Sequence, residues 1–364
     1  MVDNLGDGVG SRNDGTENAA ANATARANDA RFPEADTMAK RTAEPAIPST
    51  MMAAVIDRHG GPSVFRLREM PTPEPEADQV LIEIHTAGIG SWDAEMRDGE
   101  FNPSGQRRFP RILGVDGSGT VVAKGNRVRR FAIGDRVWAY DFENAGFYAQ
   151  YVVVDADNAG RVPGRMPLRS AGAAAVTGLT ALQGVVDSAE IRRGETVLVF
   201  GATGAVGTLA VQFAKWRGAS VIATATGRKA TTLVRTLGAR KAIDARARDA
   251  AEQLADAAPD GVDVVLAFAG GRELERLLDL LPRGARLVYP NGVEPKPRKR
   301  AGMRIRAYDA EVSSSDFAKL ARATVASRLD VPIDGTYPLS QAANAHRRLK
   351  KGVLGRLVLG VRRD

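Results

Sequence analysis

The stretch T-V-L-V-F-G-A-T-G-A-V-G, residues 196–207, combines three patterns in order. An apolar run at 197–200 is followed by glycines at 201, 204 and 207, and then by a helical pattern at 208–217. Glycines at this spacing let the backbone turn tightly and approach a diphosphate, and the N-terminus of the following helix faces the anion. The stretch therefore predicts a dinucleotide-binding turn. Because it begins only at residue 196, a sizeable unit must precede it.

The composition sets limits on the partners. A length of 364 residues favours two domains, and 44% apolar residues suffice for sizeable cores. A net charge of +8, from 51 basic and 43 acidic residues, permits nucleic acid or an anionic cofactor as partner. Aromatic residues make up only 5% and the basic residues are scattered, so nucleic acid is disfavoured. The one dense basic run, 296–300, lies in a Pro-rich segment and predicts a solvated loop.

Several classes of site and location are disfavoured by what the sequence lacks. It has no cysteine and three histidines, which excludes thiolate-bound metal and argues against a multi-histidine site. It has no apolar run of membrane-spanning length. Residues 1–50 lack apolar periodicity and predict a disordered tail. That tail has neither the apolar core of a secretory signal nor the acid-poor composition of a transit peptide, so we expect a cytoplasmic protein.

Along the chain the pattern changes from β-rich to alternating. Short strands separated by Gly, Pro, Asn and Asp are expected from 52 to 163, as in a barrel with tight turns. A helix is expected at 171–187, followed by strands at 197–200, 220–224, 261–268 and 286–289 with helices between them. A strand at 303–308, helices at 316–328 and 342–351, and a strand at 356–361 complete the prediction. The alternation predicts an α/β fold with a parallel, doubly wound sheet.

The order of these motifs resembles one family. Eight motifs follow one another along the chain: M-A-A-V-I-D-R-H-G-G-P (52–62), A-G-I-G-S-W-D-A-E-M-R-D-G (87–99), F-P-R-I-L-G-V-D-G-S-G-T-V (109–121), F-A-I-G-D-R-V (131–137), G-F-Y-A-Q-Y (146–151), T-G-L-T-A (177–181), L-G-A (237–239) and A-H-R-R-L…G-R-L-V-L (345–359). Together they are similar to the zinc-independent branch of the medium-chain dehydrogenase/reductase superfamily, the quinone oxidoreductase and enone reductase-like proteins. The resemblance covers residues 51–361.

The resemblance implies a discontinuous architecture. A GroES-like β-barrel domain would comprise residues 51–170 and 311–364, and a Rossmann domain that binds NADP would comprise 171–310. The active site would lie between the two domains, and the protein would form a homodimer.

The resemblance also bears on metal chemistry. Zinc-dependent members carry a Cys near Gly90–Asp93 and a His-Glu pair after the glycine that matches Gly114. Val115 stands in place of the histidine, and the chain has no cysteine. We therefore expect no metal, and hydride transfer from a nicotinamide to a quinone or an α,β-unsaturated carbonyl compound, whose delocalised acceptor needs no strong Lewis acid. Solvent or a pocket hydroxyl would supply the proton.

The end of the second Rossmann strand addresses the choice between NADPH and NADH. NAD enzymes usually place an acid there to bind the ribose 2′-hydroxyl. Here strand 221–224 leads into Thr226, Arg228 and Lys229, with no acid. Two cations and a hydroxyl suit a 2′-phosphate, which favours NADPH, although both cations could instead begin a solvated helix.

The cofactor and acceptor sites are each expected to involve a set of residues. The cofactor candidates are Thr177, Thr203, Gly204, Ala205, Val206, Gly207, Thr226, Arg228, Lys229, Ala269, Gly270, Tyr289, Asn291, Gly292 and Arg356. Thr177 could instead cap a helix, and Arg356 could be a surface cation. Candidates for the acceptor pocket are Ser91, Trp92, Asp93, Phe101, Phe147 and Tyr148, with no catalytic residue assigned. A structural role is favoured for Asp93, and the aromatic side chains could form a slot for a planar acceptor or pack in the core.

The acceptor is the weakest part of the resemblance. Quinone reductases commonly have Asn at the position of Gly90 and often a Tyr at Glu95 or Phe101, and all three differ here. Two alternatives therefore remain. The first is an enoyl-thioester reductase that uses the basic run 296–300 as the entrance for a phosphopantetheine carrier. The second is a non-catalytic sensor, or a nucleic-acid-binding protein, that has kept the fold.

Overall fold

The computed structural model describes residues 47–102, 105, 108–144 and 146–362. Of the predicted tail, residues 1–46 lie outside the described part. Residues 47–50 are described, and Thr50 is already the first residue of strand β1, so the predicted tail boundary at residue 50 is too late.

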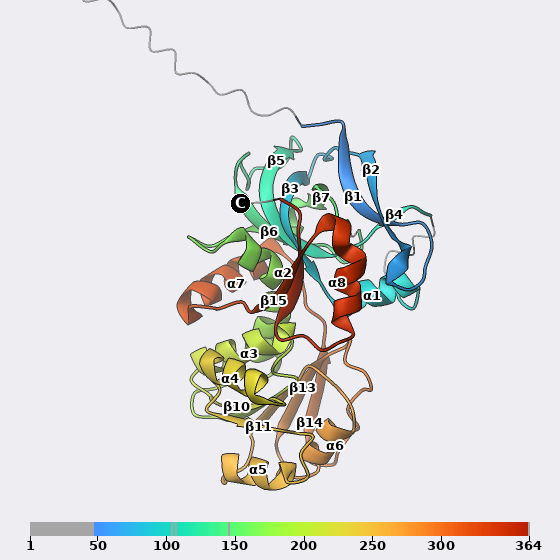
Figure 1. Cartoon of the computed structure of the whole chain (residues 1–364). Coiled ribbons are helices and arrows are strands. Elements are labelled where there is room, and N and C mark those ends of the chain that lie inside the picture. The colour runs from blue at the N-terminus through green and yellow to red at the C-terminus, as the bar shows by residue number, and fades with distance from the viewer. Residues whose placement is uncertain (1–46, 103–104, 106–107, 145, 363–364) are drawn as a thin grey trace, which may run out of the picture. The chain divides into compact units, whose positions relative to one another are not determined.

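The N-terminal part of the described chain, together with strands from its C-terminal end, builds one antiparallel and one mixed sheet (Figure 1). A three-stranded sheet has the order β2–β1–β4, and a seven-stranded sheet has the path β15–β16–β3–β5–β6–β8 with β7 paired to β3. Their strands are β1 (Thr50–Ile56), β2 (Phe65–Pro71), β3 (Gln79–Ile89), β4 (Arg111–Ile112), β5 (Asp116–Lys124), β6 (Arg136–Tyr140), β7 (Tyr151–Asp155), β8 (Ala159–Arg161), β15 (Ile333–Pro338) and β16 (Arg356–Gly360).

The C-terminal strand belongs to the N-terminal sheet. Strand β16 pairs antiparallel with β3, with Leu357 opposite Ile89 and Gly360 opposite Thr86. On its other side β16 pairs parallel with β15. The two ends of the folded chain therefore share one sheet, as the discontinuous architecture requires.

Helix α2 (Leu168–Gln183) connects the two halves and continues into a π-helical turn at Gly184–Ser188. It packs on β3, β5 and β6 on one side and on α3 (Ala205–Trp216) on the other. Gly172 makes the contact with β3 close, because a Cβ there would lie 2.6 Å from the carbonyl oxygen of Thr86. The remaining helices beside these sheets are α1 (Ser91–Asp98), α7 (Ser314–Ser327) and α8 (Ala342–Leu349), with short 3₁₀ turns at Pro62–Val64, Ala156–Asn158 and Leu339–Gln341.

The second half forms a six-stranded parallel sheet with the order β11–β10–β9–β12–β13–β14. Its strands are β9 (Thr196–Phe200), β10 (Ser220–Thr224), β11 (Lys241–Ile243), β12 (Val264–Ala267), β13 (Arg286–Pro290) and β14 (Arg304–Tyr308). Besides α3, its helices are α4 (Arg228–Leu237), α5 (Ala250–Ala257) and α6 (Arg272–Leu278), labelled in Figure 1. The apolar runs 197–200 and 264–267 are buried throughout, as central parallel strands covered on both faces should be.

The predicted α/β fold class, a GroES-like barrel with a Rossmann sheet, is confirmed. The elements that escaped prediction include α1, β11, α5 and β15. Helix α1 lies within the motif 87–99, for which no helix was predicted, and β11 has only three residues, too few for a periodic pattern. The domain boundaries at 170/171 and 310/311 stay predictions, because Ile47–Asp364 forms one compact unit. No helix in the described ranges has the length and apolar character needed to cross a membrane.

Candidate functional site

Apart from Thr177 and Arg356, the predicted cofactor residues lie along one edge of the parallel sheet. Strands β10, β9, β12 and β13 run parallel, so their carboxyl ends, and the loops that follow them, meet at that edge. The chain moves from β9 to β10 on one side, and β12 lies on the other side of β9. This reversal of strand order is where ligands bind in open α/β sheets.

The glycine turn between β9 and α3 is a close-packed cradle. Gly201 has φ +76°, and a Cβ there would lie 3.2 Å from the amide nitrogen of Ala269. A Cβ on Gly207 would lie 2.2 Å from the carbonyl oxygen of Gly201, so no larger residue fits without a shift of backbone. Gly204 is the N-cap of α3, and no side chain caps the helix. The first N–H groups of α3 therefore remain available to an anion.

Thr203 to Val206 are partly exposed, and the C-terminal strand fixes their position. The amide of Gly355 donates to the carbonyl oxygen of Thr203 at 2.8 Å, and Gly355 forms a parallel bridge with Gly204. The cradle thus lies directly beside the first residue of β16, Arg356. The sequence gives no sign of this junction, because about 150 residues separate its two sides.

Arg228 and Lys229 lie exposed at the first turn of α4, after Gly227 with φ +82°. Among the described residues neither side chain has a hydrogen-bond or ion-pair partner. The Thr226 hydroxyl donates to Asp244 at 2.8 Å, and Asp244 also accepts from the amide of Arg246 at 3.0 Å. Asp244 follows β11, the strand that the sequence did not reveal, so this carboxylate beside the predicted phosphate site was missed.

The remaining cofactor candidates at this edge differ in exposure. Ala269, Asn291 and Gly292 are exposed and Gly270 is half-buried, whereas Tyr289 is buried. A Cβ on Gly270 would lie 2.2 Å from the carbonyl oxygen of Pro295, which holds this loop close to its neighbour. The side-chain amide of Asn291 donates to Asp309 at 2.7 Å. The Tyr289 side chain packs in the core of the parallel sheet, so it offers a ligand little besides its backbone.

Thr177 lies in the middle of α2 rather than at its cap. Its side chain is 1% exposed, and its hydroxyl donates to the carbonyl oxygen of Ala173 at 2.9 Å. The alternative of a helix cap is therefore wrong. Any contact between this hydroxyl and a nicotinamide stays a prediction.

Arg356 is buried in an ion pair, so the alternative of a surface cation is wrong. Its Nη2 donates to Asp116 Oδ1 at 2.6 Å, and both side chains are almost wholly buried. Asp116 Oδ2 accepts from the amide of Val176 in α2, and the guanidinium lies 5.5 Å from the ring centroid of Trp92. Gly88 makes room for this arrangement, since a Cβ there would lie 2.3 Å from Arg356 Nη2.

A second buried polar group ties α1 to α8. Arg97 Nη1 donates to His346 Nδ1 at 2.8 Å, and His346 Nε2 lies 3.2 Å from the Tyr148 hydroxyl. Arginine can only donate, so Nδ1 must be unprotonated and a neutral ring must carry its hydrogen on Nε2. Burial, with the nearby Arg97 charge, lowers the pKa of His346 to about 3, which keeps the ring neutral. The sequence assigned no role to His346.

Asp93 lies next to both groups. Its Oδ2 accepts from the amide of Gly90 at 2.7 Å, which caps α1, while Oδ1 is buried without a hydrogen-bond partner. Burial is the main cause that raises the pKa of Asp93 from 3.8 to about 7, with a further rise from Asp116. The capping bond and Arg356 act in the opposite direction. The cap agrees with the structural role favoured for this residue.

The predicted aromatic slot divides into an accessible and an inaccessible part. Trp92 and Phe101 are half-buried, and the centroid of the Phe101 ring lies 5.4 Å from that of the tilted Phe142 ring. Phe147 and Tyr148 have no exposed surface and belong to the main core, so core packing accounts for them. Ser91 is exposed at the start of α1. The sequence did not identify Phe142 as a member of this aromatic group, because a single aromatic residue in a polar loop forms no recognisable pattern.

The segments that ligate zinc in metal-dependent relatives hold other groups here. Val115 is buried, and Asp116 is committed to Arg356. Within the described residues no group of three or more His, Asp or Glu side chains is arranged to hold a metal ion. The expectation of a metal-free site stays a prediction.

Two family models match the chain. Residues 76–164 match the alcohol dehydrogenase GroES-like domain, and residues 205–304 match the model described as zinc-binding dehydrogenase. Quinone oxidoreductase from Mus musculus is 30% identical over 325 residues, which cover 85% of this chain and 97% of that protein. The NADPH-dependent alkenal/one oxidoreductase, chloroplastic, of Arabidopsis thaliana is 30% identical over 321 residues, covering 85% of this chain and 79% of that protein.

A solved structure of a quinone oxidoreductase has the same fold as this chain. Escherichia coli quinone oxidoreductase complexed with NADPH superimposes with a TM-score of 0.75 at 25% identity, over 86% of this chain and all of that one. The sequence, the two-sheet architecture and these likenesses point to one family of oxidoreductases. The chain belongs to the medium-chain dehydrogenase/reductase superfamily, in its quinone oxidoreductase-like branch.

Proposed function

We propose that the protein is an NADPH-dependent oxidoreductase that transfers hydride to a quinone or an α,β-unsaturated carbonyl compound without a metal ion. Family membership supports an oxidoreductase that uses a nicotinamide cofactor. The observation that carries the finer proposal is the uncapped glycine cradle at the reversal of strand order, with two unpaired cations at the end of the next strand.

The residues present fit a dinucleotide. The amides at the start of α3 would hold its diphosphate, and the close contacts of Gly201 and Gly207 keep the cradle open to that group. The loops at Ala269–Gly270 and at Asn291–Gly292 would border the nicotinamide half, because they follow β12 and β13 at the same edge. When bound, the cofactor supplies the hydride, and the protein supplies position and exclusion of water.

The cations at the start of α4 support NADPH over NADH. Arg228 and Lys229 have no partner among the described residues and could hold a 2′-phosphate with charge-assisted hydrogen bonds. Asp244 is the opposing charge in this loop. Its Oδ1 accepts from the Thr226 hydroxyl and from a backbone amide, which stabilise the negative charge without cancelling it, so one carboxylate stands against two cations. We infer that the two free cations dominate.

The choice of acceptor rests on chemistry and on the names of relatives. The sequence has no cysteine and carries Val115 where zinc-dependent members have histidine. A quinone or enone spreads the charge of added hydride over its conjugated system, so it can react without a metal. Trp92 and Phe101, both half-buried, would offer planar surfaces to such an acceptor, and Ser91 or solvent would supply the proton. Relatives named quinone oxidoreductase and alkenal/one oxidoreductase support this class.

The enoyl-thioester alternative has less support. The basic run 296–300 was its only basis, and Arg300 is already paired with Glu275 at 2.7 Å and with Asp279 at 2.8 Å. The amide of Arg298 also donates to Glu275. A loop that is held by carboxylates of α6 and its C-cap offers fewer free charges to a phosphopantetheine carrier.

The assignment of NADPH is tested by the double change Arg228→Glu and Lys229→Ala. Loss of two charge-assisted contacts, at about 1.5–3 kcal/mol each, should raise the KM for NADPH at least about tenfold and leave that for NADH nearly unchanged. Arg235→Ala, an exposed cation later on α4, is the matched control and should change neither. An unchanged KM for NADPH would show that these residues do not bind a phosphate.

The acceptor class is tested by NADPH consumption with quinones, enones, enals and enoyl-CoA esters. Turnover of quinones or enones supports the proposal, and a preference for enoyl-CoA would replace it. Cofactor binding without any turnover would favour the non-catalytic alternative. The homodimer stays a prediction that sedimentation can measure.

A further inference from the structure

Gly90 and Trp92 fit closely against one another at the start of α1. A Cβ on Gly90 would lie 2.3 Å from Trp92 Cε2 and 2.5 Å from Trp92 Cζ2, so the indole lies directly over the glycine. Gly90 has φ −120° and ψ 170°, an extended conformation that any residue can adopt. The backbone therefore does not require glycine here, whereas the contact with the indole does. The indole fills the space that a side chain at position 90 would use.

The indole also lies near the glycine cradle. Arg356 Cζ is 5.5 Å from the centroid of the Trp92 ring. The residue before Arg356, Gly355, forms the bridge with Gly204 in the cradle. One arginine side chain thus separates the indole from the backbone that borders the proposed diphosphate site. Trp92 therefore lies within the reach of a dinucleotide held by the cradle, and a hydride acceptor has to approach that dinucleotide.

Packing alone does not explain a tryptophan at position 92. The side chain is half-buried, so part of the ring surface is accessible. Its Nε1 is buried and has no hydrogen-bond partner among the described residues. A buried indole usually finds an acceptor for its N–H, and a buried polar group without one lowers stability. Phenylalanine would fill much of the same space without that cost, so the choice of tryptophan points to a role in binding.

We propose that Trp92, accommodated by Gly90, is the specificity-determining residue of the acceptor site and restricts the acceptor to a single ring or a short enone. This role rests on the proposed function, hydride transfer to a quinone or an α,β-unsaturated carbonyl compound. A single planar ring can stack on the accessible surface of the indole, whereas a fused second ring needs the volume that the indole occupies. Because packed side chains yield little, such a wall discriminates by size.

The size limit is tested by steady-state reduction of 1,4-benzoquinone and 1,4-naphthoquinone with NADPH. The quantity compared is kcat/KM for the two-ring quinone divided by kcat/KM for the one-ring quinone, because comparing this ratio between variants cancels the different reactivity of the two compounds. Trp92→Ala should raise the ratio at least about tenfold, since it opens space that only the larger acceptor needs. Trp92→Phe keeps most of the ring and should raise the ratio less than about threefold. For an enzyme that reduces only enones, 3-buten-2-one and 4-phenyl-3-buten-2-one give the same comparison.

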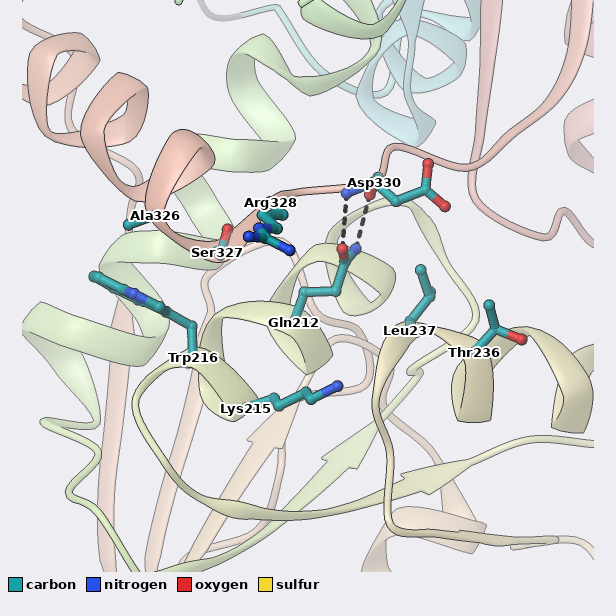
Figure 2. A pocket seen from close by; sticks show the side chains of 9 residues that line it. All are labelled: Gln212, Lys215, Trp216, Thr236, Leu237, Ala326, Ser327, Arg328 and Asp330. Atoms are coloured by element: carbon teal, nitrogen blue, oxygen red, sulfur yellow. Dashed lines mark hydrogen bonds between the residues drawn. The ribbon is translucent and has the colours of Figure 1, made fainter.

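Trp216→Ala is the matched control, because it removes another partly exposed indole. Trp216 is 39% exposed and lines a groove with Gln212 and Ser327, as Figure 2 shows. It is the last residue of α3, about 16 Å along the helix from the cradle at Ala205. Its removal should keep the ratio within about twofold of wild type.

Two kinetic outcomes separate this role from the proposed function. If wild type reduces both acceptors of a pair and Trp92→Ala leaves their ratio unchanged, the size limit is wrong and the proposed function stands. If wild type reduces neither quinones nor enones, the proposed function is wrong, and the role of Trp92 in acceptor selection is wrong with it.

The fit between positions 90 and 92 is tested without cofactor or acceptor, by thermal unfolding. The Cβ of Gly90→Ala displaces the indole in wild type, whereas no ring opposes it in Trp92→Ala protein. Gly90→Ala should therefore lower the melting temperature by at least about 3 °C more in wild type than in the Trp92→Ala background. The loss of glycine at the N-cap of α1 contributes equally in both backgrounds and cancels. Equal decreases in the two backgrounds would overturn the fit, whatever the kinetics show.

Discussion

The substitution Asp93→Asn should make the stability of the protein less sensitive to pH. Burial raises the pKa of Asp93 from 3.8 to about 7 in the folded protein. Between these values the folded state holds a proton on Asp93 that the unfolded state has lost. The contribution of this proton to the free energy of unfolding is therefore fully present below about pH 4 and declines as the pH rises towards 7.

The magnitude follows from the width of that range. Between the two pKa values, each pH unit lowers the free energy of unfolding of wild type by about 1.4 kcal/mol. From pH 5 to pH 7, wild type should therefore lose about 3 kcal/mol of unfolding free energy relative to Asp93→Asn. Asparagine can still accept the hydrogen bond that Gly90 donates to the side chain, so the cap of α1 is kept. His346 contributes equally to both proteins and cancels in the comparison.

The assay is urea unfolding at pH 5 and pH 8, followed by circular dichroism and by the fluorescence of the three tryptophans. Asp57→Asn is the matched control, because Asp57 forms an exposed ion pair with Arg68. The difference between that variant and wild type should stay within about 1 kcal/mol at both pH values. If wild type and Asp93→Asn change in parallel from pH 5 to pH 8, the inferred proton on buried Asp93 is wrong.

Two further substitutions test the cradle and the buried ion pair. Gly207→Ala should lower stability by about 1–3 kcal/mol and abolish cofactor binding, since its Cβ would lie 2.2 Å from a carbonyl oxygen. Gly61→Ala, with no atom within 4 Å of the added Cβ and outside the proposed cofactor site, is its control in thermal unfolding and cofactor titration. Arg356→Met should cost about 3–5 kcal/mol in urea unfolding by leaving Asp116 buried and unpaired. Adding Asp116→Asn should recover part of that loss, and a purely additive double variant would contradict a coupled pair.

The parts of the fold that depend on local rules were accessible from the sequence. The prediction of strand 220–224 matches β10, and α4 follows it as one of the helices expected between the strands. The hydrophobic period and the spacing of glycines are local properties of the chain. A buried strand needs a run of apolar side chains, and the turn at Gly207 needs a residue without Cβ. This approach failed for the eight-residue helix α1, 91–98, because so short a segment with mixed polar and apolar residues carries no clear period.

The sequence by itself therefore determined the α/β class, the place of the dinucleotide turn and the cations that follow β10. Only the tertiary structure decided which distant side chains meet. Arg356 pairs with Asp116 across 240 positions, and His346 meets Arg97 across 249. The charge and tautomer of these groups depend on burial and on partners brought by other segments, and no local pattern encodes that environment. The physical reason is that dihedral preferences act between neighbouring residues, whereas desolvation and pairing act between elements that pack together.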